Sequence, residues 1–324
     1  MFFKSDGSDF IHSKFLLESS WGTRVLSLRK NNSADLTRLV KEGGAVMPFF
    51  TRGNARIYFE DVGRGDPLIT VHGLNENTAY WSLPGVTGKL AGSCRVMSMD
   101  MRGHGRSVVT GDPPGFNADT VGDDIIGLAD HLGLGRFHLM GHSTGGFASS
   151  RLAMKDSSRL VSLILTNTTS ATSPVSGDPE SIRRLNDAFA RSFEEFTLDQ
   201  IIAYVRKNPS PFFRGVIESE NSDELLRSYR RVMESNDRGI IAAFIRSFFT
   251  DPDPMIEGLR SIRCPVLIIY GDKDDLFIQS SRLMAKEIPG AEILEYKGVG
   301  HLSAFEAPVR LAADVIDFIK RHPV

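Results

Sequence analysis

The sequence has few of the features that mark secreted, disulfide-bonded or nucleic-acid-binding proteins. Only 2 of its 324 residues are cysteines, Cys94 and Cys264, which lie far apart and show no metal-ligand spacing. We therefore expect two buried thiols in a reducing compartment rather than a disulfide. The formal net charge of -2 gives no reason to expect a nucleic-acid partner or a membrane partner.

Long hydrophobic runs are also missing. No stretch approaches the ~20 consecutive apolar residues that cross a bilayer. The apolar piece Phe15-Leu16-Leu17 near the N-terminus is short and interrupted, unlike the apolar segment of a secretory signal. The sequence predicts a cytoplasmic monomer or homodimer whose partner is a small-molecule substrate.

Residues 1–46 differ from the rest of the chain. They are rich in Ser, Asn, Lys and Arg and contain few apolar residues at regular spacing. Two explanations remain open: a real extension that lies over the domain, or upstream sequence that precedes a natural start at Met47. We treat 1–46 as an N-terminal extension of uncertain structure.

From Phe49 onward, strand and helix patterns alternate. A hairpin is expected from Phe49–Arg52 and Arg56–Phe59, turning at Gly53-Asn54. The alternation predicts an α/β protein with a mostly parallel, twisted sheet flanked by helices. Further strands are expected over 67–71, 95–99, 137–140, 160–165, 265–270 and 293–296, and helices over 80–90, 117–132, 145–155, 280–288 and 310–319.

The strand pattern disappears between Asn167 and Ile262. Helical periodicity replaces it over 180–196, 198–205, 223–233 and 239–249. This organisation predicts a helical cap inserted before the penultimate strands of the sheet. The expected domains are a core of residues 47–168 and 260–324 and a cap of residues 169–259.

A candidate nucleophile lies in Gly141-His142-Ser143-Thr144-Gly145. This motif follows a predicted strand and opens a predicted helix, which is the context of a nucleophile elbow. The tight turn requires small neighbouring residues and holds the serine hydroxyl at the carboxyl end of its strand. Because a serine hydroxyl is a weak nucleophile, it needs a general base, a group that orients the base, and donors for an oxyanion.

The chain from about Phe49 onward resembles the α/β-hydrolase family, and within it the small, capped, cofactor-free branch. The resemblance implies an α/β-hydrolase fold. It is carried by landmarks that occur in the family's order: His72-Gly73, Asp100-Met101-Arg102-Gly103-His104-Gly105-Arg106-Ser107, the Ser143 motif, Gly271-Asp272-Lys273-Asp274 and Gly300-His301.

The catalytic partners of Ser143 are expected in the order Ser, Asp, His. His301 lies in a loop between the last strand and the last helix, from which it can reach Ser143. The resemblance implies that Asp274 is the acid that orients His301. Asp272 and Asp275 remain alternatives, while Asn167-Thr168 argues against an acid after the preceding strand.

Two backbone N–H groups should form the oxyanion hole. They belong to Thr144, which follows the nucleophile, and to Leu74 in the loop after His72-Gly73. The run Asp100–Ser107 is interpreted as a structural turn braced by charged hydrogen bonds. The sequence contains no phosphate-binding glycine loop and no cluster with metal-ligand spacing, so neither a cofactor nor a metal is expected.

Serine at the elbow disfavours the dehalogenases and epoxide hydrolases of the family, which use aspartate. We expect a serine hydrolase that cleaves a carboxylic ester or lactone through an acyl-enzyme on Ser143. Alternatives are a C–C bond hydrolase, a perhydrolase or haloperoxidase-like enzyme, and a non-catalytic receptor. Leu74-Asn75-Glu76-Asn77 replaces the longer Gly-Pro-Gly loop of the C–C hydrolases, which favours an esterase or lactonase.

The predicted cap is rich in phenylalanine, which indicates an apolar crevice of small to medium size. Three cationic side chains in the cap offer a possible contact for a substrate carboxylate: Arg206, Lys207 and Arg214. The phenylalanines are Phe189, Phe193, Phe196, Phe212, Phe213, Phe244, Phe248 and Phe249.

Overall fold

A computed structural model describes residues 15–17, 24–26, 48–111, 114–171, 179–208, 210–251 and 253–324. The chain divides into two units, Met1–Met47 and Pro48–Val324. In the first unit, β1 (Phe15–Leu17) pairs antiparallel with β2 (Arg24–Leu26). Both explanations for residues 1–46 therefore stay predictions.

The second unit begins with the predicted hairpin. Strand β3 (Phe49–Arg52) pairs antiparallel with β4 (Ala55–Gly63) across a turn at Gly53-Asn54. Gly53 has a φ of 55°, which glycine accepts without steric cost. β4 continues into the main sheet, where Phe59 lies opposite Met99.

The main sheet is mostly parallel, as predicted. Its strand order is β11-β10-β9-β8-β5-β6-β4-β3, with β7 paired to β4. All neighbours from β6 to β11 are parallel, so each connection must cross over the sheet. The remaining strands are β5 (Asp66–Val71), β6 (Cys94–Met99), β7 (Val108–Val109), β8 (Phe137–His142), β9 (Leu160–Thr166), β10 (Val266–Gly271) and β11 (Glu292–Tyr296).

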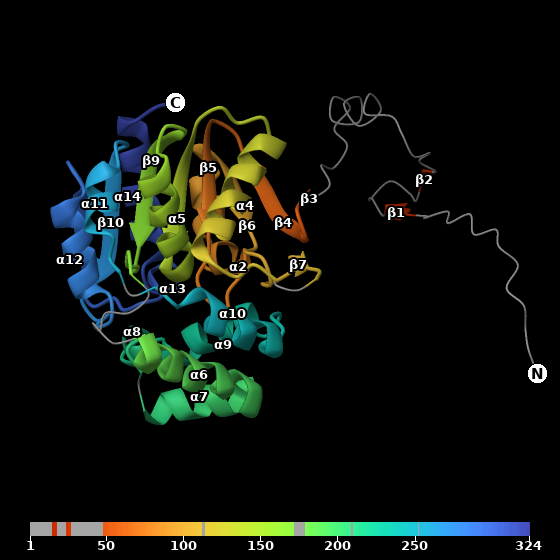
Figure 1. The fold of residues 1–324 in the computed structure, drawn as a ribbon, viewed down its shortest axis with the longest axis vertical. Helices are drawn as coiled ribbons and strands as arrows, with labels where there is room; N and C mark the ends of the chain where they lie inside the picture. Colours follow the sequence, from red (N-terminus) through yellow and green to blue (C-terminus); the bar gives the residue numbers. More distant parts are fainter. Residues whose placement is uncertain are drawn as a thin grey trace, which may run out of the picture. The chain divides into compact units, whose positions relative to one another are not determined.

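Helices cover both faces of the sheet, so the central strands are largely apolar and buried. Every residue of β9 and of β10 is buried. Side chains from α4, α5, α11 and α12 pack on one face, and those from α3 and α14 on the other; Figure 1 shows α4 and α5 in front of the sheet. These helices are α3 (Val86–Leu90), α4 (Ala118–His131), α5 (Ser143–Lys155), α11 (Ile256–Ser261), α12 (Ile278–Glu287) and α14 (Pro308–Arg321).

The single helix expected over 80–90 is wrong. The structure has two short helices there, α2 (Ala79–Ser82) and α3, separated by Leu83-Pro84-Gly85. Gly85 has a φ of 83°, a left-handed conformation that ends one helix before the next begins. The Pro84-Gly85 pair within this range is a local signal against one continuous helix.

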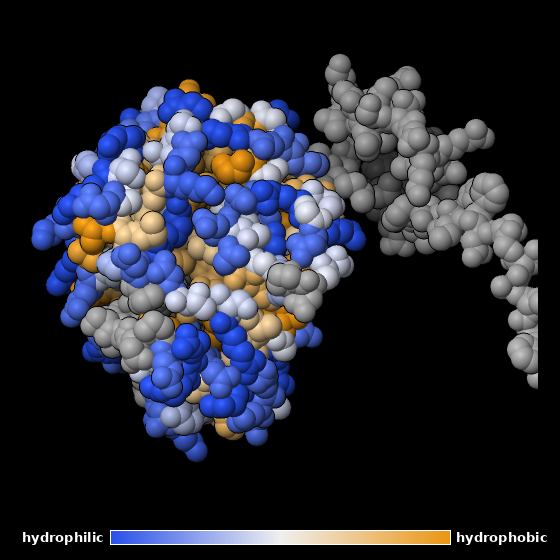
Figure 2. Space-filling model, in the orientation of Figure 1, coloured by the Kyte–Doolittle hydropathy of each residue, from blue (hydrophilic) through white to orange (hydrophobic). Residues whose placement is uncertain are grey.

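Helices occupy the chain between β9 and β10. They lie together at one end of the unit (Figure 1, lower helices), and their outer surface is mostly hydrophilic in Figure 2. We call residues 179–248 the helical insertion. Its helices are α6 (Pro179–Glu195), α7 (Leu198–Lys207), α8 (Arg214–Ile217), α9 (Ser222–Met233) and α10 (Arg238–Phe248).

The helical insertion is held together by packing between α6 and α10. Ala190 of α6 and Ile241, Ala242 and Ile245 of α10 form a buried apolar cluster. The expected boundary at 259/260 falls inside α11, whose Ser261 Oγ donates a hydrogen bond to Met154 O of α5. The domain boundaries of the insertion remain predictions.

Two further findings concern the thiols and the hydrophobic length of the helices. Cys94 and Cys264 are both buried and unpaired, which confirms that they form no disulfide. Within the part of the chain that the structure describes, no helix is both long enough and apolar enough to cross a membrane.

The run Asp100–Ser107 is a braced turn after β6, as expected. The buried guanidinium of Arg102 donates two hydrogen bonds to Asp124 of α4, at 2.7 and 2.8 Å. The Asp100 carboxylate accepts from the backbone N–H groups of Thr78 and Arg106. The turn is thereby tied both to α4 and to the loop that follows β5.

We expect Asp124→Asn to lower the free energy of unfolding by about 3–5 kcal/mol, because it leaves the buried Arg102 charge without its ionic partner. Glu292→Gln breaks a two-bond pair of the same kind with Arg321, but there both side chains are about half exposed. That control should cost less than about 1 kcal/mol. Unfolding of the wild type and the two variants in guanidinium chloride measures both free-energy changes. Equal losses of stability in the two variants would contradict a structural role for the buried pair.

Candidate active site

Ser143 lies at the turn from β8 into α5. Its φ is 48°, a left-handed conformation that is rare for a residue with a side chain. The turn is tight because α5 begins directly against the end of β5: a Cβ on Gly145 would lie 2.4 Å from His72 O. The Thr168 hydroxyl donates to Ser143 O at 2.5 Å and holds the strained turn from the side of β9.

The two predicted partners of Ser143, together with Asn167, follow neighbouring strands at the same edge of the sheet. Asn167 comes directly after β9, Asp274 after β10 and His301 after β11. Because these strands are parallel, their carboxyl ends meet, which is where ligands bind in open α/β sheets.

The structure brings Asp274 and His301 into direct contact. His301 Nδ1 lies 3.0 Å from Asp274 Oδ2, and the Asp274 side chain is fully buried. Since a carboxylate only accepts, Nδ1 is the donor and Nε2 is left to act as a base. This is the contact predicted for the acid and the base.

The alternative acids are engaged elsewhere. Asp272 accepts a hydrogen bond from Gly298 N at 2.7 Å. Asp275 is half exposed and forms an ion pair with Arg214. Neither has a hydrogen bond to His301, so the geometry favours Asp274 as the partner of the histidine.

The His301 ring is enclosed by other rings. Phe277 stacks on it with centroids 5.1 Å apart, and Phe212 of the helical insertion meets it edge-on at 5.2 Å. His142 lies 4.9 Å away on the side of the elbow. The imidazole is therefore held in orientation by packing as well as by Asp274.

The two expected oxyanion donors lie on either side of Ser143. Thr144 is buried in the first turn of α5, and Leu74 lies in the loop after β5. This loop runs close to the elbow, because a Cβ on Gly73 would lie 3.0 Å from Ser143 Cβ. Both residues therefore lie next to the serine, where the backbone donors of an oxyanion hole are needed.

A cavity of about 830 Å³ opens next to these residues. Ser143, His301 and the loop residues Leu74, Asn75 and Glu76 line it at the core. Most of the remaining lining is apolar and comes from the helical insertion, which also contributes the polar side chains of Ser192, Gln200, Ser210 and Tyr229. Among the described residues, no lysine or arginine lines it. The apolar lining comprises Phe189, Phe193, Phe196, Leu198, Ile201, Tyr204, Val205, Phe212, Phe213, Met233, Leu276 and Leu302.

The expected phenylalanine crevice is therefore present, although not every phenylalanine contributes. Phe244 and Phe248 pack into the core of the α/β unit instead. The cations proposed to meet a carboxylate do not line the cavity: Arg206 pairs with Asp223, and Arg214 pairs with Glu218 and Asp275.

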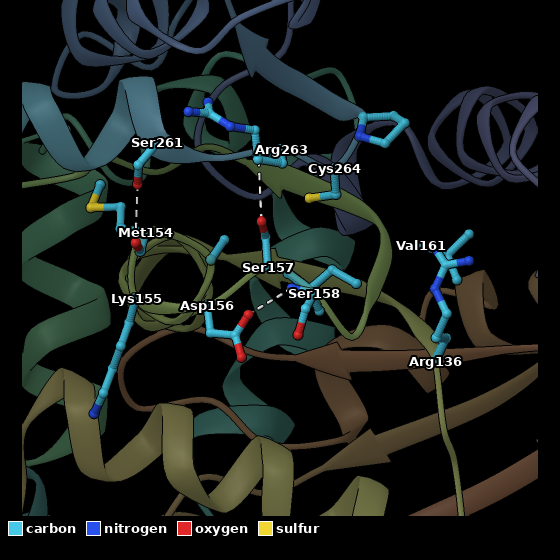
Figure 3. A pocket seen from close by; sticks show the side chains of 13 residues that line it. Arg136, Met154, Lys155, Asp156, Ser157, Ser158, Val161, Ser261, Arg263 and Cys264 are labelled. Atoms are coloured by element: carbon cyan, nitrogen blue, oxygen red, sulfur yellow. Dashed lines mark hydrogen bonds between the residues drawn. The ribbon is translucent and has the colours of Figure 1, made fainter.

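A second cavity of about 530 Å³ lies where the strands begin, at the opposite edge of the sheet. Figure 3 shows its lining, which includes Arg136 before β8, Lys155 at the end of α5 and Arg263 before β10. It contains none of the predicted catalytic residues. Parallel sheets place their sites at the other edge, so we assign the candidate active site to the larger cavity.

Three polar residues at the site were missed by the sequence analysis. The Asn167 amide donates to both Asp274 Oδ2 and Gly300 O at 3.0 Å. Glu306 accepts from the N–H groups of Gly300 and Leu302, on either side of His301. Glu76 is buried in the loop that carries Leu74. A polar residue directly after a buried strand was the available signal for Asn167.

Carboxylates surround His301 and set its protonation. Burial lowers the pKa of the imidazole, but Asp274, Glu76 and Glu306 raise it, and the net result lies above the ordinary value of 6.5. The neighbouring His142 shows the opposite result, since burial lowers its pKa despite the attraction of Glu76. The site thus stabilises positive charge on His301 selectively.

Residues 68–314 match the family model described as alpha/beta hydrolase family. The chain is 27% identical over 275 residues to a 2-hydroxymuconate semialdehyde hydrolase of a Pseudomonas species, covering 82% of this chain and 90% of that protein. It is 26% identical over 278 residues to the dihydrolipoyllysine-residue acetyltransferase component of an acetoin cleaving system of Pseudomonas putida, covering 82% of this chain but 66% of that protein. A solved structure of a thermophilic esterase from Thermogutta terrifontis superposes with a TM-score of 0.69 at 27% identity, covering 85% of this chain and 97% of the esterase.

We expect NMR titration of the His301 ring protons to give a pKa above 6.5. In Asp274→Asn the pKa should fall below 6.5, because burial then acts without the main opposing carboxylate. Asp275→Asn is the matched control and should leave the value unchanged, since that carboxylate faces Arg214. A His301 pKa that does not move in Asp274→Asn would contradict the assigned pair.

Proposed function

Because the chain belongs to the alpha/beta hydrolase family, we propose that it is a serine hydrolase that cleaves a carboxylic ester or lactone at Ser143. One observation carries the proposal. Ser143 and His301 line the same cavity, and the second ring nitrogen of His301 is bonded to the buried Asp274. Serine, histidine and aspartate together are the residues of the catalytic triad used in acyl transfer.

In the first half-reaction, His301 Nε2 takes the proton of Ser143 as Oγ attacks the carbonyl carbon. The carbonyl oxygen becomes an oxyanion, which accepts from the N–H groups of Leu74 and Thr144. The C–O bond to the alcohol then breaks, and His301 returns the proton to the leaving oxygen. Asp274 holds the tautomer and stabilises the imidazolium between these steps.

In the second half-reaction, water replaces the alcohol. His301 takes a proton from the water as its oxygen attacks the acyl-enzyme, and the acid product leaves as Ser143 regains its proton. The base must be neutral to act. The raised pKa of His301 therefore moves the acid limb of kcat/KM to a pH above 6.5.

The cavity supports a neutral substrate with an apolar arm. Its volume of about 830 Å³ suits a small to medium molecule, and its lining from the helical insertion is mainly phenylalanine and aliphatic. Among the described residues that line the cavity, Glu76 is the one Asp, Glu, Lys or Arg. An anionic substrate would lose its hydration there without gaining a cation.

This electrostatic argument places C–C hydrolysis second. The related 2-hydroxymuconate semialdehyde hydrolase is named for a substrate that carries a carboxylate. The similar esterase supports C–O cleavage in the same fold. We therefore favour an uncharged ester or lactone over a carboxylate-bearing diene.

We expect Ser143→Ala to abolish hydrolysis of p-nitrophenyl esters, with kcat lower by about 10⁴-fold or more. Asp274→Asn should lose about 10⁴-fold, because the imidazole then adopts the wrong tautomer. Asp272→Asn and Asp275→Asn serve as matched controls and should stay within about tenfold of the wild type. Full activity in Ser143→Ala would refute the mechanism, and failure of the wild type to turn over any activated ester would favour a receptor.

Acyl chain length and charge test the substrate class. Each added methylene that is buried contributes about 0.8 kcal/mol, so kcat/KM should rise about three- to fourfold per methylene from acetate toward hexanoate. The p-nitrophenyl monoester of adipic acid matches the hexanoate in length but ends in a carboxylate. It should react at least about 100-fold more slowly; equal rates would contradict the neutral-substrate assignment.

A further inference from the structure

A buried carboxylate connects the helical insertion to the loop that carries Leu74. Glu76 Oε2 accepts a hydrogen bond from Gly73 N at 2.6 Å, and Glu76 Oε1 accepts from the Tyr229 hydroxyl of α9 at 2.9 Å. The His142 ring lies 3.6 Å from Oε1. The Glu76 side chain is 1% exposed and Tyr229 is 5% exposed.

Both donors remain donors near neutral pH. The Gly73 donor is a backbone N–H, which does not titrate. Burial, followed by the nearby Glu76 charge, raises the pKa of Tyr229 well above its ordinary value of 10.0. The two oxygens of Glu76 therefore act as acceptors at the same time, one for the core and one for the insertion.

Other contacts bring the same two elements together. The Asn77 amide donates to Val232 O of α9 and to the Ser235 hydroxyl, each at 2.8 Å. The Leu74 side chain itself packs against the buried apolar cluster that α6 and α10 form in the helical insertion. The loop of residues 73–77 thus contacts the insertion before, at and after Glu76.

We propose that Glu76 is a positioning residue that couples docking of α9 to alignment of the Leu74 oxyanion donor. The inference rests on the proposed hydrolase function, because it assigns a use to that donor. Gly73 N–H and Leu74 N–H belong to adjacent peptide units. Glu76 Oε2 holds the first unit at Gly73 N–H, and His72 Nδ1, 2.7 Å from Gly73 O, holds the unit that carries Leu74 N–H. Together they restrict rotation about Gly73, and the Tyr229 bond keeps the Glu76 carboxylate in place.

The variants Glu76→Gln and Tyr229→Phe test the coupling. Glutamine has one acceptor oxygen, so it cannot accept from Gly73 and Tyr229 with separate oxygens. Each variant should lower kcat about tenfold or more and leave KM within about threefold, because the donor serves the transition state more than substrate binding. In the double variant, kcat should fall no more than about twofold below that of the worse single variant. Both substitutions break the same link between α9 and the loop that carries Leu74.

Tyr296→Phe is the matched control. It removes another hydrogen bond from a buried tyrosine to a carboxylate, that of Asp314 on α14. It should lower the unfolding temperature as much as Tyr229→Phe does but leave kcat unchanged. A similar loss of kcat in the control would show a general stability effect and overturn the proposal.

Hydrogen exchange provides a readout that needs no turnover. In Tyr229→Phe, the amides of residues 72–78 should exchange faster, while those of α5 stay as in the wild type. Unchanged exchange in residues 72–78, or fully multiplicative losses of kcat in the double variant, would overturn the coupling. If the wild type hydrolyses no ester, the proposed function fails separately, and the exchange measurement still decides the coupling.

Discussion

The left-handed conformation of Ser143 is the constraint on which the site depends. A residue with a side chain reaches a φ of 48° only where its surroundings enforce it. Here β8, buried along its whole length, ends directly against α5, and Gly145 lets the helix begin in contact with the end of β5. The sheet that makes the core therefore also presents the serine hydroxyl at its edge.

Local signals in the sequence account for most of the fold. The strands buried on both faces are strongly apolar, as in Leu160–Leu165, where Ser162 is the one polar residue, so they could be recognised without knowing their neighbours. The landmark motifs lie at strand ends, and parallel strands bring those ends together. The choice of Asp274 among three neighbouring aspartates came from the family resemblance; Asp274 lies 3.0 Å from His301, and its role as the catalytic acid stays a prediction.

The parts that could not be predicted depend on contacts between distant segments. Nothing near Glu76 in the sequence shows that it meets Tyr229, which lies 153 residues further along the chain. Asn167 looked like the absence of an acid, yet its amide bridges Asp274 and Gly300. The break between α2 and α3 is an exception, because the Pro84-Gly85 pair that separates them is a local signal in the sequence.

The distribution of charge links the catalytic groups to the shape of the cavity. Asp274, Glu76 and Glu306 lie around His301 and favour its imidazolium, which in the proposed mechanism forms as Ser143 loses its proton. The same negative charge would oppose an oxyanion if the oxyanion had no donors of its own. In the proposed mechanism, the backbone N–H groups of Leu74 and Thr144 resolve this conflict, because they supply positive potential at the oxyanion without adding a cation to the apolar cavity. A site built in this way can stabilise a transient negative charge on a carbonyl and still disfavour a substrate that arrives already charged.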